Sequence, residues 1–365
     1  MRFVLCLAVM STVLVSGCCT PRQAAASKRT RFIGLKDFSQ FAQTPGATPG
    51  EVVLTSPEIA APINWDELIV SWNVGAGTYA KIEARGIYPD HATKFYTLGL
   101  WSDNPTQHPR ESVERQRDGD GTVHTDTLAL SRPGASVQLR LTLGGSVSQA
   151  PAPLKFVGLS FCDSRVKPKA ASTRHVALGK TLDVPERRQG EYEGGGGWCS
   201  PTSLSMVLAY WSDRLNRPEL NRTVPEVAQA INDPVFDGTG NWPFNTAYAG
   251  TFPGLRAYVT RLNDVSELED WIAAGVPVII SVSSYLTNNR TTGPDNGHLI
   301  VCAGFTKDGD VVVNDPGVSI KRNQRARRVY PRERLANAWK KSKNAVYLVY
   351  PDNIPVPKSR SGNWE

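Results

Sequence analysis

The sequence predicts two folded parts, an all-β sandwich followed by an α+β domain. A chain of 365 residues is long enough to bury two hydrophobic cores of ordinary size. Between residues 64 and 162, short apolar runs alternate with turn residues, and no helical period lies between them. After residue 181, helical periods come first and strand-like runs follow, which is typical of the α+β class.

The first 50 residues are expected to direct and tether the protein rather than to fold. Residues 1–17 carry one early arginine and an apolar run too short to span a membrane, as in a secretory signal peptide. The sequence Val-Ser-Gly-Cys that ends at Cys18 resembles the bacterial lipobox. This implies an exported protein of the cell envelope, anchored to a membrane by a lipid on Cys18, with residues 18–50 as anchor and flexible tether. The alternative is an ordinary signal peptide and a secreted protein.

Residues 51–164 are expected to form the sandwich, which we predict to be jelly-roll-like. Clusters of Gly, Pro, Asn and Asp separate its apolar runs and indicate turns. The expected strands are residues 67–74, 79–88, 94–101, 124–130, 136–143 and 154–162. A basic linker, residues 165–180, follows the sandwich and contains few bulky apolar side chains.

Residues 181–352 are expected to form the α+β domain, and residues 353–365 a tail. Periodicity predicts helices at residues 201–211, 224–232, 264–274 and 332–341. It predicts strands at residues 255–262, 276–282, 298–305, 310–314 and 344–351. The segment 237–250 is rich in Gly, Asn and aromatic residues, and two interpretations stay open: the rim of a substrate groove, or an ordinary packed loop.

The overall charge narrows the classes of partner only slightly. The formal net charge is +7 and the pI is about 9.1, which favours anionic surfaces mildly without specifying nucleic acid. No nucleic-acid-binding motif accompanies the basic residues, and the glycines at 194–197 lack the preceding strand of a nucleotide-binding loop. We therefore expect neither a nucleic-acid partner nor a cofactor.

Cys199 is the candidate nucleophile. The body of the chain has three widely spaced cysteines, an odd number that leaves at least one thiol without a disulfide partner. Cys199 directly precedes a predicted helix, with Ser200 near the N-cap and Pro201 in the first turn. The positive end of the helix dipole and its free N–H groups stabilise a thiolate at such a position. The alternative is a small buried apolar residue, which is our interpretation of Cys302.

His298 is the candidate general base, because it is the one histidine after residue 181. A third group must hold its imidazole in position. We expect Asp315 in this role, with Asn314 as the alternate, because both lie at the end of the next strand. A two-residue turn at 308–309 would put Asp315 opposite Cys302, and a longer loop would bring it level with His298. An ordinary turn is the alternative explanation of these polar residues.

Gln189 is the candidate oxyanion donor. Cysteine hydrolases of this kind pair a backbone N–H with a side-chain amide slightly upstream of the nucleophile, and such a donor lowers the barrier by roughly 3–4 kcal/mol. Gln189 lies ten residues before Cys199, so the loop between them must fold back.

Taken together, these motifs resemble a known family. The order Cys, His, Asp, with a helix that begins at the Cys, resembles the papain-like cysteine peptidases. The sequences GWCSPTSLSMVLAYW, NGHLIVCAGF and VVVNDPG resemble the branch of the double-glycine leader peptidases, cysteine peptidase family thirty-nine. The likeness covers residues 180–351 and is greatest to exported, stand-alone bacterial members. It implies a papain-like fold with Cys199, His298, Asp315 and Gln189 as nucleophile, base, orienting acid and oxyanion donor.

Two departures from the family pattern concern the substrate more than the chemistry. The sequence has no ATPase or membrane-spanning segments to couple cleavage to export, and Gln189 lies farther upstream than in leader peptidases. We expect a cysteine peptidase that acts on a peptide or protein through an acyl-enzyme, with carbohydrate or cell-wall contact by the sandwich. The alternatives are a transglutaminase-like acyl transferase and a non-catalytic surface-binding protein.

Overall fold

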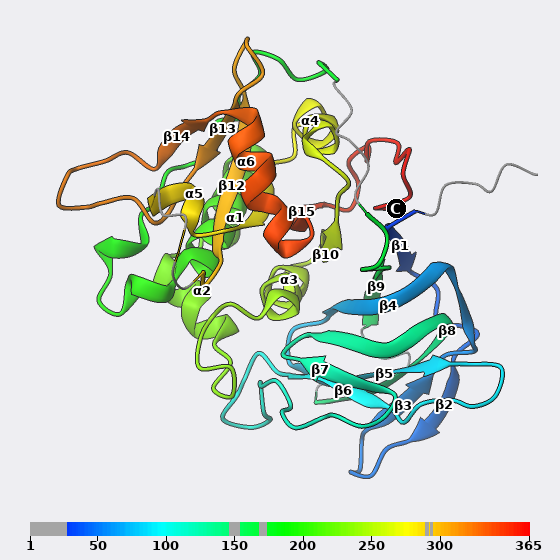
Figure 1. The fold of residues 1–365 in the computed structure, drawn as a ribbon. Helices are drawn as coiled ribbons and strands as arrows, with labels where there is room; N and C mark the ends of the chain where they lie inside the picture. The colour runs from blue at the N-terminus through cyan, green and yellow to red at the C-terminus, as the bar shows by residue number, and fades with distance from the viewer. Residues whose placement is uncertain (1–27, 146–153, 168–173, 289–291, 293–294) are drawn as a thin grey trace, which may run out of the picture.

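The computed structural model of the chain describes residues 28–145, 154–167, 174–288, 292 and 295–365. The expected signal peptide and the lipidation site Cys18 lie outside these residues. Within the described part of the chain, no helix has both the length and the apolar composition needed to cross a membrane. The described residues form two sheets, one in the N-terminal region and one in the C-terminal region, with helix α3 between them (Figure 1).

The N-terminal region, residues 30–162, is built from antiparallel strands. These are β1 (Thr30–Leu35), β2 (Ala42–Pro45), β3 (Val52–Thr55), β4 (Ile59–Val74), β5 (Thr78–Ile87), β6 (Tyr96–Trp101), β7 (Gly121–His124), β8 (Thr127–Gly145) and β9 (Leu154–Cys162). The strands run in the order β1-β9-β4-β8-β3-β2, with β5 and β7 also paired to β8 and β6 paired to β5. Hydrogen bonds thus join all nine strands into one sheet, and the two separate layers of a jelly-roll-like sandwich stay a prediction.

The expectation of a flexible tether over residues 18–50 is wrong for its second half. Strand β1 pairs with β9 from Thr30↔Cys162 to Leu35↔Val157, and β2 pairs with β3. Phe32 explains why β1 docks: its ring is buried and stacks on Tyr258 of the C-terminal region, with 4.5 Å between ring centroids. Burial of such a ring offsets the entropy lost when this segment is ordered, so residues 30–35 form a strand instead of a tether.

The C-terminal region, residues 181–351, combines helices with one antiparallel sheet. Its helices are α1 (Cys199–Leu215), α2 (Val224–Ile231), α3 (Trp242–Thr251), α4 (Val265–Ala273), α5 (Tyr285–Asn288) and α6 (Arg332–Trp339). Its strands are β10 (Leu255–Arg261), β11 (Val278–Val282), β12 (His298–Phe305), β13 (Val311–Asn314), β14 (Arg327–Tyr330) and β15 (Ala345–Pro351), in the order β10-β15-β11-β12-β13-β14. The first three helices precede every strand of this sheet.

Helix α3 occupies most of the segment for which a groove rim or a packed loop was expected. Asn241 caps the helix by accepting a hydrogen bond from the Phe244 N–H, and a proline lies in the first turn. Phe244 is fully buried and makes edge-to-face contacts with Trp72 and Trp101 of the N-terminal region. The segment was missed as a helix because its glycines and asparagines interrupt the apolar period.

Side chains of β4 cover the exposed edge of the C-terminal sheet. Asn73 Nδ2 donates to the Ala257 carbonyl at 2.8 Å, and the Ala257 N–H donates back to Asn73 Oδ1 at 3.1 Å. Ser71 Oγ accepts from the Val259 N–H at 2.8 Å. Because β10 is an edge strand of its sheet, these side chains satisfy backbone groups that a further strand would otherwise pair.

The expected tail, residues 353–365, returns to the N-terminal region. The Phe32 N–H donates to the Gly362 carbonyl at 2.8 Å, and the C-terminus lies beside β1 (Figure 1). Trp364 is buried against Trp271 of α4. The last residues therefore pack against both regions of the protein.

Candidate active site

Cys199 is the first residue of α1 and is half-buried. No side chain of the described residues caps this helix, whose N-cap is Trp198 rather than the expected Ser200. Ser200 instead donates from Oγ to Asn245 Oδ1 at 2.8 Å, deep in the core. The helix N-terminus is therefore open at the sulfur, where the Ser200 and Leu299 N–H groups also act on it.

Glycines let the chain turn tightly into this helix. Gly194 has φ of +73°, in the left-handed region that glycine adopts without strain. A Cβ at Gly195 would lie 2.0 Å from the Gln189 carbonyl oxygen, so no other residue fits there. The close approach folds residues 189–191 back against the loop that leads to Cys199, as the distance of Gln189 from the nucleophile in the sequence requires.

His298 begins β12 and joins the two other candidate residues. Its Nε2–H donates to Asp315 Oδ1 at 2.7 Å, in a pair that is almost fully buried. The ring also forms a hydrogen bond with the Cys199 side chain, for which Nδ1 is the remaining nitrogen. His298 thus connects Cys199 to Asp315 through hydrogen bonds, in the order nucleophile, base and orienting carboxylate.

A β-bulge brings Asp315 to the same side of the sheet as His298. Phe305 pairs with Val311 across the hairpin, but Cys302 pairs with Val313, so one extra residue enters β12 between Cys302 and Gly304. Without this residue, Asp315 would face the opposite side of the sheet, because a shift of one residue reverses every side chain. Neither of the two registers considered from the sequence, which assumed a regular hairpin, included this bulge.

The bulge is held from outside the hairpin. The Leu182 N–H donates to the Ala303 carbonyl at 2.7 Å, and the Phe305 N–H donates to the Lys180 carbonyl at 2.8 Å. A Cβ at Gly304 would lie 2.4 Å from that Lys180 oxygen. Glycine at position 304 is therefore needed for residues 180–182 to pack against the bulge.

Asp315 has two further donors that the sequence analysis missed. The Gly317 N–H donates to Oδ1 at 2.9 Å, and the Tyr330 hydroxyl donates to Oδ2 at 3.0 Å. A Cβ at Gly317 would lie 2.9 Å from His298 Cε1. Gly317 lies two residues after Asp315, and the sequence Asp-Pro-Gly could have indicated a tight turn there. Tyr330 lies on β14, a strand that was not predicted.

The charges of the three groups support one another. Burial alone raises the pKa of the Cys199 thiol, but the hydrogen bond and charge of His298 and two backbone N–H groups outweigh it and lower the pKa. Burial likewise disfavours the charged imidazole, yet Asp315 and Cys199 raise the pKa of His298 to about 10. The pKa of Asp315 is lowered because its hydrogen bonds outweigh its burial. The arrangement therefore favours a thiolate–imidazolium pair beside an ionised carboxylate.

Gln189 lies in the loop before Cys199, and its side chain is engaged in a contact within this loop. Its Nε2 donates to the Gly196 carbonyl at 2.9 Å, and its backbone N–H donates to the Pro316 carbonyl at 3.0 Å. These bonds tie the loop before Cys199 to the turn after Asp315. An amide NH2 has two donors, so one N–H of Gln189 is left for another acceptor.

Asn314 and Cys302 lie away from His298. The Asn314 side chain donates hydrogen bonds to the carbonyls of Val184 and Pro185 and accepts one from Arg327. These contacts hold it on the side of β13 opposite to Asp315. Cys302 is completely buried, and burial raises the pKa of its thiol to about 12. Within the part of the chain that the structure describes, no group of His, Cys, Asp and Glu side chains is arranged to hold a metal ion.

Comparison with protein families decides the relationship. Residues 181–347 match the model of the Peptidase C39-like family, and residues 43–160 match the model of the Peptidase C39 N-terminal domain. The chain therefore contains a Peptidase C39-like domain preceded by a Peptidase C39 N-terminal domain. The candidate residues from Gln189 to Asp315 all lie inside the matched C39-like domain, and strands β3 to β8 lie inside the matched N-terminal domain.

Solved structures resemble this C39-like protein only distantly. A C39-like peptidase candidate from Bacillus anthracis is 19% identical over 47% of this chain and 98% of that chain, with a TM-score of 0.34. A structure of infectious bursal disease virus, strain Gt, is 13% identical over 43% of this chain and 37% of that chain, with a TM-score of 0.20. No curated protein matches the chain.

Proposed function

We propose that the protein is a cysteine peptidase that hydrolyses peptide bonds with Cys199 as nucleophile. The match of residues 181–347 to the Peptidase C39-like family supports a cysteine-peptidase-like function and a peptide or protein substrate. The observation that carries the proposal is the position of His298, whose ring contacts the Cys199 side chain on one side and Asp315 on the other. This is the arrangement by which a base activates a thiol and is itself held in place by a carboxylate.

In the proposed reaction, the Cys199 thiolate attacks the carbonyl carbon of the scissile peptide bond and forms a tetrahedral oxyanion. The imidazolium of His298 gives its Nδ1 proton to the leaving amine, the C–N bond breaks, and a thioester remains on the enzyme. Neutral His298 then takes a proton from water, whose oxygen attacks the thioester. The tetrahedral intermediate collapses, the C–S bond breaks, and the acid product leaves the Cys199 thiolate beside the His298 imidazolium. Asp315 keeps the ring oriented and stabilises its charge throughout.

The oxyanion would be held by the Cys199 N–H and by Gln189. The helix N-terminus supplies the first donor and a favourable dipole. Gln189 supplies the second through the N–H of Nε2 that the Gly196 contact does not use, or by a rotation that breaks this contact. The proposal predicts that Gln189→Ala slows turnover by about a hundredfold or more while the Cys199 thiol stays as reactive toward small alkylating agents.

Export and lipid anchoring are proposals that rest on the sequence alone. The apolar N-terminal run and Val-Ser-Gly-Cys before residue 19 favour a lipid on Cys18. Growth with a labelled fatty acid tests this directly: the label should enter the wild-type protein and not a Cys18→Ala variant. Equal labelling of both would contradict the anchor.

The peptidase proposal is tested by the products of the full chain. A peptide library is incubated with wild-type protein, with Cys199→Ala, and with Cys302→Ala as a control for a cysteine outside the site. Mass spectrometry should find new peptide termini with wild-type and Cys302→Ala, and none with Cys199→Ala. Release of ammonia without new termini would instead indicate acyl transfer to amines, and the absence of any Cys199-dependent product would contradict the proposal.

A further inference from the structure

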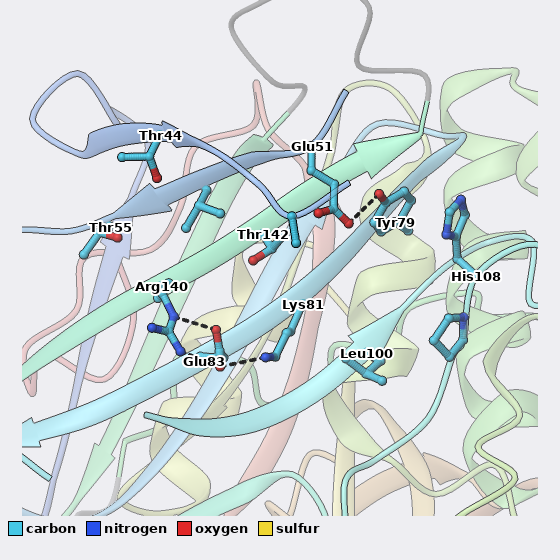
Figure 2. Close-up of a pocket in the computed structure, with 13 residues that line it drawn as sticks. Thr44, Glu51, Thr55, Tyr79, Lys81, Glu83, Leu100, His108, Arg140 and Thr142 are labelled. Carbon is cyan, nitrogen blue, oxygen red and sulfur yellow. Dashed lines mark hydrogen bonds and ion pairs between the residues drawn. The ribbon is translucent and has the colours of Figure 1, made fainter. Parts of the chain in front are cut away.

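The N-terminal region has a pocket of its own, lined by polar and apolar side chains, with a volume of about 680 Å³ (Figure 2). Its floor is one face of strands β3, β8, β5 and β6, which pair directly with one another there. Threonine hydroxyls line it at Thr44, Thr55 and Thr142, and charged side chains stand at its two ends. None of the candidate catalytic residues lines this pocket.

The two ends of the pocket carry opposite charge. At one end, the carboxylate of Glu83 is buried and pairs with both Lys81 and Arg140, so that two cations share one anion. The side chains of Lys81 and Arg140 remain 43% and 37% exposed and can bind a further anion. At the other end, Glu51 accepts a hydrogen bond from the Tyr79 hydroxyl at 2.7 Å, and its hydrogen bonds hold its pKa below the usual value. The pocket therefore offers a positive end and a negative end.

The pocket does not present an aromatic face of the kind on which a sugar ring stacks. Tyr79 is the one aromatic carbocycle that lines it, and His108 covers that ring at 3.7 Å between centroids. Tyr79 also lies over Gly144, where a Cβ would fall 2.1 Å from the ring. With these two neighbours against it, Tyr79 serves to position its hydroxyl beside Glu51. These contacts favour a ligand with separated charges over a carbohydrate.

Neighbouring hollows lie between this pocket and Trp198, the residue before the nucleophile. The pocket shares His108 and Pro109 with a second hollow of about 410 Å³. That hollow shares Arg110 and Asn232 with a third, of about 350 Å³, which is lined by Trp198, the residue before Cys199. Neighbouring hollows thus have common walls from the sheet of the N-terminal region to the start of α1.

The boundary between the two regions is fixed along this path. Arg110 is buried and donates to the Ser102 carbonyl and, across the boundary, to the carbonyls of Gln229 and Asn232. The Ser112 N–H also donates across it, to Asp233 at 3.1 Å. A peptide bound along this path would therefore contact both regions at the same time.

We propose that this pocket is a distal binding site for the polypeptide substrate, which reaches it in an extended form from the scissile bond at Cys199. The proposal rests on the proposed peptidase function and adds a preference to it. Glu51 lies at the Tyr79–His108 end, which is the end nearer the nucleophile, so it takes a basic substrate residue. Lys81 and Arg140 lie farther away and take an acidic residue beyond it.

The spacing of the two charged substrate residues follows from β5. Tyr79, beside Glu51, and Glu83, between the two cations, are four residues apart on this strand. At about 3.3 Å per residue this is about 13 Å, a length that an extended peptide also covers with about four residues. The preferred segment therefore has a basic and an acidic residue separated by about three others.

The binding test uses full-length Cys199→Ala protein and three fluorescein-labelled peptides of 20 residues. One is a Gly/Ser peptide with Lys and Glu four positions apart, one has Gln at both positions, and one has two lysines. Fluorescence anisotropy should give a dissociation constant about tenfold lower for the Lys/Glu peptide than for the other two. The double variant Glu51→Gln/Lys81→Gln should abolish this difference. Lys94→Gln, a matched exposed lysine outside the pocket, should preserve it.

Three results would overturn the distal site. These are equal binding of all three peptides, a difference that survives in the double variant, and binding of N-acetylglucosamine tetramer at the pocket in place of the peptides. With wild-type protein, saturating Lys/Glu peptide should also slow cleavage of 20-residue library peptides and spare hexapeptides; equal inhibition of both lengths contradicts the path. Since binding is measured on a protein without its nucleophile, failure of the distal site is distinct from failure of the peptidase proposal, which would appear as a lack of Cys199-dependent cleavage.

Discussion

Replacement of Asp315 by asparagine removes one charge from the site and keeps a side chain of nearly the same shape. The pKa of His298 is about 10 against an ordinary 6.5, which corresponds to a preference for the imidazolium of about 5 kcal/mol. Asp315 and Cys199 share this effect. A carboxylate in direct contact accounts for roughly 1–3 pKa units of it, or about 1.4–4 kcal/mol. The variant should therefore form the thiolate–imidazolium pair about 10 to 1,000 times less readily.

The rate of alkylation by iodoacetamide measures this equilibrium without any substrate. Only the thiolate reacts, so Asp315→Asn should be much slower than wild type at pH 6. Near pH 9.5, where an ordinary thiol also ionises, the two rates should approach each other. Mass spectrometry of the peptide that carries Cys199 gives its rate separately from the other cysteines. The buried Cys302 serves as an internal control, since its alkylation would report unfolding.

Superimposable pH profiles for the wild-type protein and Asp315→Asn would refute the reasoning. They would mean that the carboxylate at 2.7 Å does not stabilise the imidazolium, and that the low pKa of Cys199 has another origin. A variant that reacts more slowly by the same factor at every pH would also contradict it, because that pattern indicates altered access rather than altered ionisation.

The other predictions concern the groups that hold this site and the boundary between the two regions. Tyr330→Phe removes one hydrogen bond to an ionised group, a contribution of about 1.5–3 kcal/mol, and should lower the alkylation rate at pH 6 by about tenfold. Gly317→Ala places a methyl group 2.9 Å from the His298 ring and should lower the same rate while unfolding stays cooperative. Asn73→Ala leaves both backbone groups of Ala257 without a partner and should reduce the free energy of unfolding by about 2–4 kcal/mol in urea.

The Gly317→Ala prediction has a matched control, and each of the three has an outcome that would contradict it. Gly119→Ala adds a methyl group in open space and should leave the alkylation profile unchanged. If it slows the reaction as much as Gly317→Ala does, the steric argument fails. A Tyr330→Phe variant that is alkylated at pH 6 as fast as the wild type would contradict the prediction for this variant. For Asn73→Ala, an unchanged urea midpoint would mean that water replaces the lost bonds at no cost.

The sequence carried enough information to locate the candidate site. A cysteine at the expected start of a helix and a single histidine after residue 181 identified two residues that the structure brings into contact. Strong apolar periods also located most of the helices and strands after residue 181. These features are local, because helix starts and buried strands depend mainly on neighbouring residues.

The features that the sequence did not reveal depend on distant contacts. The bulge that turns Asp315 toward His298 is stabilised by residues 180–182, about 120 positions earlier. Strand β1 is held in place because Phe32 packs on Tyr258. Helix α3 is held in place because Phe244 packs on two tryptophans of the N-terminal region. In each case tertiary packing outweighs a weak local pattern.

Ultraviolet absorbance at 240 nm, followed as a function of pH, tests the central claim most directly, since it reports the thiolate itself. The difference between wild type and Cys199→Ala isolates the signal of one sulfur. We expect this thiolate to persist well below the pH at which an ordinary thiol ionises. In His298→Ala it should be lost and return only at the alkaline pH of a buried thiol. A wild-type thiolate that forms only near pH 9, and at the same pH in His298→Ala, would contradict the account.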